Sequence, residues 1–110
     1  MTGDIEAEGE RFLKEFSTGD AAARSALRPK GQELAQRIHS AAVHLGMAKA
    51  TEFSPHIPRL FLLAAKIAFL AFGAGAPELE PFERDVRYYA NFHPPDPIVA
   101  AYDAFTRTTP

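Results

Sequence analysis

The chain has 110 residues, the size of one domain, and its 12 basic and 14 acidic residues give a formal net charge of −2. It contains no cysteine, which excludes disulfides, cysteine-ligated metal sites and thiol catalysis. The first residues are acidic where a secretory signal is basic, so we expect a cytoplasmic protein.

The first elements along the chain are predicted to be helical, because no run of residues alternates between apolar and polar positions as a half-buried strand does. The first helix is expected over about residues 4–16, where apolar residues recur on one face. A short helix over residues 21–27 follows, with Asp20 as its N-cap. Arg28-Pro29 is expected to end it, since the residue before a proline avoids the α region.

A long helix is predicted next, over residues 30–49. Its apolar side chains recur at alternating intervals of four and three residues, which is typical of a helix packed along a narrow seam. The residues of this seam are Leu34, Ile38, Ala41, Leu45 and Ala48. Val43 and Met47 point away from the seam, which indicates a second contact surface.

The third long helix is predicted over residues 54–72, and its only charged residues are Arg59 and Lys66, one heptad apart. A helix that is apolar on nearly every side is buried. A chain of this length offers little material to surround it, so the helix is expected to be the centre of a bundle or to be covered partly by another chain. The apolar run over residues 60–76 is short for a membrane span and contains Lys66, so a core helix is favoured over a membrane role.

Two further helices complete the prediction. One runs over about residues 81–92, and the last begins at the Asp96-Pro97 cap and carries its apolar residues on one face. The predicted fold is therefore an all-α, compact bundle of four to five helices in one domain, residues 1–110, with a central and nearly all-apolar third helix.

Charge is unevenly distributed along the chain. Residues 24–66 contain seven basic and two acidic residues, whereas the segments on either side are acidic overall. One interpretation is that acidic helices pack beside the basic one and neutralise it. The other is a basic face for phosphates, formed by Arg24, Arg28, Lys30, Arg37, His44 and Lys49. The negative charge of the whole chain favours the first interpretation.

Catalytic and metal-binding patterns are largely missing from the sequence. No two histidines have the spacing that places metal ligands on one helix face. Ser40 and His44 resemble a nucleophile and its base, but a helix surface offers no oxyanion hole. Lys66 is a candidate amine for covalent or general-base chemistry, although its position one heptad from Arg59 favours a spine facing solvent or an interface. We therefore predict no catalytic residue, metal or cofactor.

The expected function is that of a small non-enzymatic helical interaction protein. As a subunit, adaptor or inhibitor, it docks on a larger protein partner or self-associates through Val43, Met47, Arg59 and Lys66. The alternative is a small subunit of a larger complex that binds the phosphate backbone of nucleic acid through residues 24–66. A ligand-binding or catalytic bundle is the third hypothesis.

Overall fold

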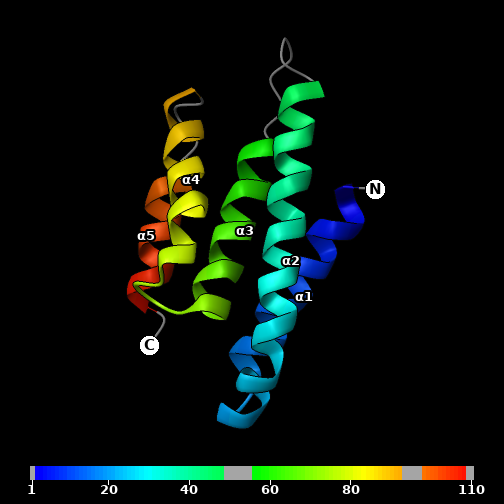
Figure 1. The fold of residues 1–110 in the computed structure, drawn as a ribbon, viewed down its shortest axis with the longest axis vertical. Coiled ribbons are helices and arrows are strands. Elements are labelled where there is room, and N and C mark those ends of the chain that lie inside the picture. Colours follow the sequence, from blue (N-terminus) through cyan, green and yellow to red (C-terminus); the bar gives the residue numbers. More distant parts are fainter. Residues whose placement is uncertain (1, 49–55, 93–97, 109–110) are drawn as a thin grey trace.

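A computed structural model describes residues 2–48, 56–92 and 98–108, and every long element in these ranges is an α-helix. The helices form the predicted all-α bundle (Figure 1). In chain order the elements are α1 (Thr2–Thr18), α2 (Ala21–Ala48), α3 (His56–Phe72), the 3-10 turn η1 (Pro77–Leu79), α4 (Glu80–Phe92) and α5 (Ile98–Thr108).

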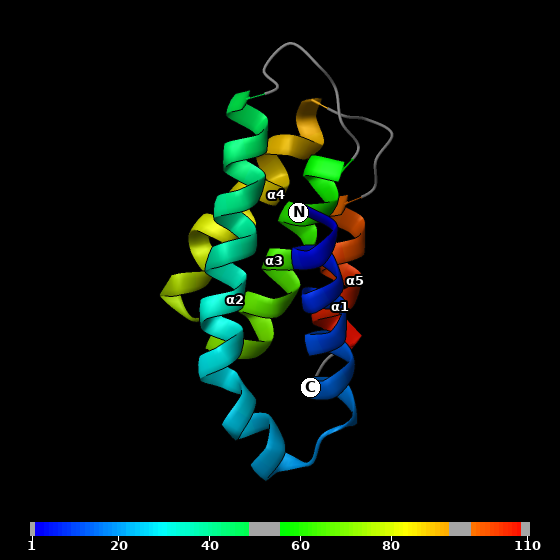
Figure 2. The same ribbon diagram turned by 90° about the vertical axis from the view of Figure 1, so that its right-hand side faces the viewer.

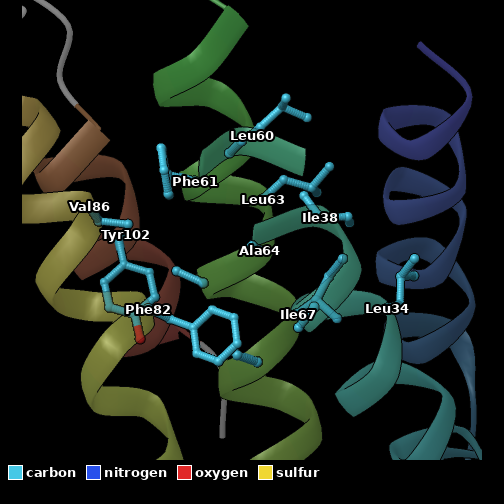
Figure 3. Packing of buried hydrophobic residues seen from close by; sticks show 14 of the residues in the cluster. Leu34, Ile38, Leu60, Phe61, Leu63, Ala64, Ile67, Phe82, Val86 and Tyr102 are labelled. Carbon is cyan, nitrogen blue, oxygen red and sulfur yellow. The ribbon is translucent and has the colours of Figure 1, made fainter. Parts of the chain in front are cut away.

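Helix α3 is the centre of the bundle, as the sequence predicts. It packs against α1, α2, α4 and α5, and α2 lies along it as its main neighbour (Figures 1 and 2). Leu60, Ala64 and Ile67 are fully buried within the cluster that these helices enclose (Figure 3). The chain therefore buries most of its most apolar helix, while Leu62 and Phe69 of that helix are only partly buried. None of the helices in the described ranges is both long and apolar enough to cross a bilayer.

Two glycines allow the helices around α3 to approach closely. A Cβ atom added at Gly9 of α1 lies 2.7 Å from Leu63 Cδ2, the flexible end of a side chain. One added at Gly31 of α2 lies 2.9 Å from Ala71 Cβ and closer still to the ring of Phe12. Residue 31 is therefore the point where α1, α2 and α3 meet with no room for a methyl group.

The prediction that Arg28-Pro29 ends a short helix is wrong, because residues 21–27 belong to α2 and Pro29 lies inside that helix. A proline has no N–H, so the usual bond to the carbonyl of Ser25 is not made. Both residues are exposed, and water can hydrate the released carbonyl at the surface. Figure 2 shows that α2 bends near this end, the expected consequence of an internal proline.

A buried tyrosine joins the last two helices. The Tyr102 hydroxyl of α5 donates a 2.8 Å hydrogen bond to Glu83 Oε2 of α4, and the tyrosine side chain is 2% exposed. Burial, together with the hydrogen bond to the carboxylate, raises the pKa of Tyr102 above the ordinary tyrosine value. The folded state therefore favours the neutral, protonated form of the Tyr102 phenol.

The Gly31→Ala substitution is expected to lower the free energy of unfolding by up to about 2 kcal/mol. Overpacking against the Phe12 ring costs roughly 1–3 kcal/mol, which exceeds the ~1 kcal/mol gained in helix propensity. Urea unfolding followed by circular dichroism measures the change. Ser25→Ala, at an exposed position of the same helix, is the matched control and is expected to be neutral or slightly stabilising. Equal stabilisation by both substitutions contradicts the close approach at Gly31.

Tyr102 is expected to make the protein less stable in alkaline solution. Because the pKa of Tyr102 is raised in the folded state, the folded protein binds more protons than the unfolded chain above about pH 10. The contribution of Tyr102 to the free energy of unfolding is therefore constant below about pH 10. Above that pH it falls, by up to about 1.4 kcal/mol per pH unit. Tyr102→Phe should flatten this decline, whereas Tyr88→Phe, at a residue that is 53% exposed, should leave it unchanged. Identical pH profiles for the two variants would exclude this role of Tyr102.

Candidate binding site

A cavity of about 490 Å³ lies where α1, α3 and α5 end and α2 begins. Figure 2 shows these helix ends in the lower half of the molecule. The apolar part of its wall comes from three helices and consists of Leu13, Phe16, Phe69, Leu70 and Phe105. The polar part consists of Ser17, Arg24, Arg28, Thr106 and Thr108. The cavity therefore combines an aromatic interior with two guanidinium groups.

Arg24 closes the C-terminal end of α1. Its Nε donates a 2.9 Å hydrogen bond to the carbonyl of Phe16, and its Nη2 donates one of 3.2 Å to the carbonyl of Ser17. The guanidinium carbon also lies 5.5 Å from the centre of the Phe16 ring. Carbonyls at a helix C-terminus lack partners within the helix and attract positive charge. Arg24 therefore stabilises the turn between α1 and α2.

Arg28 lies one helical turn further along the same wall and has a different role. It is exposed, and it makes no hydrogen bond or ion pair with any residue that the structure describes. All five of its N–H groups are therefore available to a ligand. Pro29 immediately follows Arg28 in α2, and the first two turns of that helix carry both arginines that line the cavity.

The hydroxyl groups that line the cavity already donate hydrogen bonds to backbone carbonyls. Ser17 donates to the carbonyl of Lys14 at 2.9 Å, and Thr106 donates to the carbonyl of Asp103 at 3.0 Å. Thr108 donates to the carbonyl of Ala104 at 3.0 Å. A hydroxyl whose proton is engaged can only accept a further hydrogen bond. The side-chain donors left for a ligand in the described wall are therefore the two guanidiniums.

The described wall of the cavity carries a positive formal charge. None of its described lining residues is acidic, while two are arginines. Three helix C-termini at the cavity contribute partial negative charges of about half a unit each, against which the start of α2 contributes a similar positive one. Two full positive charges exceed this sum, and Arg24 already engages the α1 carbonyls.

The less covered face of α3 leads towards this cavity. Along it, Lys66 is partly buried with its Nζ 5.4 Å from the centre of the Phe105 ring, and Arg59 is exposed one heptad away. The Phe105 ring packs edge-to-face against Phe69, with ring centres 6.2 Å apart. Lys66 makes no ion pair with another described residue, and its cation–π contact is with the ring of Phe105. The structure therefore brings two of the predicted partner-binding residues onto one face.

The other predicted partner-binding residues are not at this face. Val43 is partly buried and packs against the hydrophobic core from α2. The side chain of Met47 lies outside the part of the chain that the structure describes. Their role in partner binding stays a prediction.

The predicted basic face for phosphates is divided in the structure. Arg24 turns to the end of α1, and Arg37 forms a 3.2 Å ion pair with Glu8 of α1. Lys30 and His44 are exposed, and Lys49 lies outside the described residues. Exposed ion pairs such as Arg37–Glu8 add little to stability, but this one provides the neutralisation between helices that the sequence suggests.

His39 is a partly buried histidine between α2 and α4. Its Nε2 lies 2.5 Å from Asp85 Oδ2 of α4, and its ring packs edge-to-face against Phe61 and Phe82. A second hollow, of about 430 Å³, lies beside it and is lined also by Ser40. The described side chains contain no group of three or more metal-ligating residues. His39 therefore serves to join α2 to α4.

Comparison with known proteins provides no further information about the site. No protein-family model matches the chain. No curated protein and no solved structure matches it either.

Arg24→Ala is expected to lower the free energy of unfolding by about 1–2 kcal/mol, because two carbonyls at the end of α1 lose a charged donor. Arg28→Ala is the matched control, one turn away, and is expected to change stability by less than about 0.5 kcal/mol. Urea unfolding of both variants measures the difference. Comparable losses from the two substitutions would show that Arg28 also has a structural role.

Proposed function

We propose that this chain is a small non-enzymatic interaction protein that docks on a larger protein partner through the cavity between α1, α2, α3 and α5. The observation that carries the proposal is a cavity with an aromatic interior, an unpaired arginine and no acidic residue in its described wall. Protein interfaces are anchored by a few residues that fill such hollows, and arginine is prominent among them. An acidic segment with an apolar side chain is the complementary partner.

Outside the cavity, the described surface has few features of a docking site. Among the large hydrophobic residues that the structure describes, Tyr88 on α4 is strongly exposed. Most of the apolar surface of α3, which the sequence suggested as an interface, is buried within the bundle. Self-association through α3 therefore has less support than docking of a different protein. Arg59 and Lys66 extend the positive surface beyond the cavity along α3.

Nucleic-acid binding is the alternative function and is less well supported. Binding to a phosphate backbone requires several accessible cations arranged along one surface. Arg24 and Arg37 are instead engaged within the chain, by the end of α1 and by Glu8. A titration with single- and double-stranded DNA at two salt concentrations tests this alternative directly, because backbone binding weakens steeply with salt.

Docking can be tested with a photo-crosslinking amino acid placed at Ala74, which is exposed at the cavity. Expressed in the source cells, this protein is expected to form a covalent adduct with one acidic protein, identified by mass spectrometry. Placement at Ala100, exposed elsewhere on α5, is the matched control and is expected to give no such adduct.

Charge reversal tests whether the same adduct depends on the arginine. Arg28→Glu in the Ala74 crosslinking protein should reduce the adduct about tenfold or more, since a charged hydrogen bond is lost and repulsion is introduced. Lys30→Glu introduces the same change of charge outside the cavity wall and should have little effect. No adduct from position 74, or an adduct equally reduced by both substitutions, would overturn the proposed docking site.

A further inference from the structure

We propose that the same cavity binds a small amphiphilic carboxylate, with its apolar chain in the aromatic interior and its carboxylate on Arg28. This inference goes beyond the proposed function, because the ligand is a small molecule and its binding needs no protein partner. The volume of about 490 Å³ lies within the range of roughly 300–1,000 Å³ that is usual for such sites.

The polarity of the ligand follows from the groups that the cavity offers. The hydroxyls of Ser17, Thr106 and Thr108 have already donated their protons to carbonyls of their own helices. The side-chain donors that remain are guanidinium N–H groups, so the polar end of a ligand that binds them must accept hydrogen bonds. No described lining residue is acidic, so a cationic end finds no counter-charge. An anionic acceptor is the group that fits.

Arg28 is better placed than Arg24 to hold the carboxylate. The Nε and Nη2 groups of Arg24 already donate hydrogen bonds to the carbonyls at the end of α1. Arg28 has no partner among the described residues, and its planar fork can form two parallel hydrogen bonds with a carboxylate. Because Arg28 is exposed, the carboxylate lies at the mouth of the cavity and keeps part of its hydration.

The shape of the interior favours an apolar chain for the rest of the ligand. Phe16 and Leu13 of α1 line the cavity together with Phe69 of α3 and Phe105 of α5. Burial of methylene groups against these side chains is favourable by about 0.8 kcal/mol per group. Acetate lacks such groups and should not bind measurably, whereas decanoate has both a carboxylate and a long chain.

The test is a titration of the purified full-length chain with decanoate, kept at concentrations where the fatty acid is monomeric, by calorimetry and by NMR. One molecule is expected to bind per chain, with contacts between the ligand chain and the Phe69 and Phe105 rings. Decanol, which lacks the charge, should bind with an affinity at least about tenfold lower. Binding of several molecules per chain, or equal binding of decanol, would overturn the proposal.

Variants at one arginine and one lysine distinguish binding at the cavity from general attraction of the carboxylate to a positive surface. Arg28→Gln should weaken decanoate about tenfold or more, and Arg28→Lys should restore part of the affinity because it keeps the charge without the fork. Lys30→Gln removes one exposed charge outside the wall and should leave the affinity unchanged. Unchanged binding by Arg28→Gln refutes the inference. Because this experiment contains no partner, its failure is distinct from a failure of the crosslinking experiment.

Discussion

Enclosure of α3 by the four other helices is the constraint on which the rest of the structure depends. Its side chains are apolar on nearly every side, and water must be excluded from them. Four shorter or more polar helices achieve this by packing around it, with α2 alongside most of its length. Glycine at position 31 and small side chains such as Ala64 and Ala68 let the backbones come close enough to leave no gap.

This arrangement leaves space where the helices end. The C-terminal ends of α1, α3 and α5 meet the bent start of α2, and their side chains line the cavity rather than fill it. Two arginines from the first turns of α2 line this cavity, and their roles differ. Arg24 holds the end of α1, so that Arg28 remains available for an external group.

The two proposals share one chemistry. A partner protein and a small amphiphile would both present a carboxylate beside an apolar group, which is the combination that the cavity wall matches. If both bind, the small molecule competes with the protein, and docking responds to its concentration. The other polar contacts between helices, such as His39–Asp85 and Tyr102–Glu83, are partly buried and join α4 to α2 and to α5.

The sequence alone determined the all-α class, the positions of most helices and the central place of α3, because periodicity and apolarity are properties of residues close together in the chain. It misjudged Pro29, because the effect of a proline on a helix depends on whether solvent can satisfy the released carbonyl. The cavity was decided only by tertiary structure, since its wall joins residues from Leu13 to Thr108 that share no local pattern. The same is true of Arg24 and Arg28, which share a basic segment in the sequence and have different roles only because the end of α1 reaches one of them.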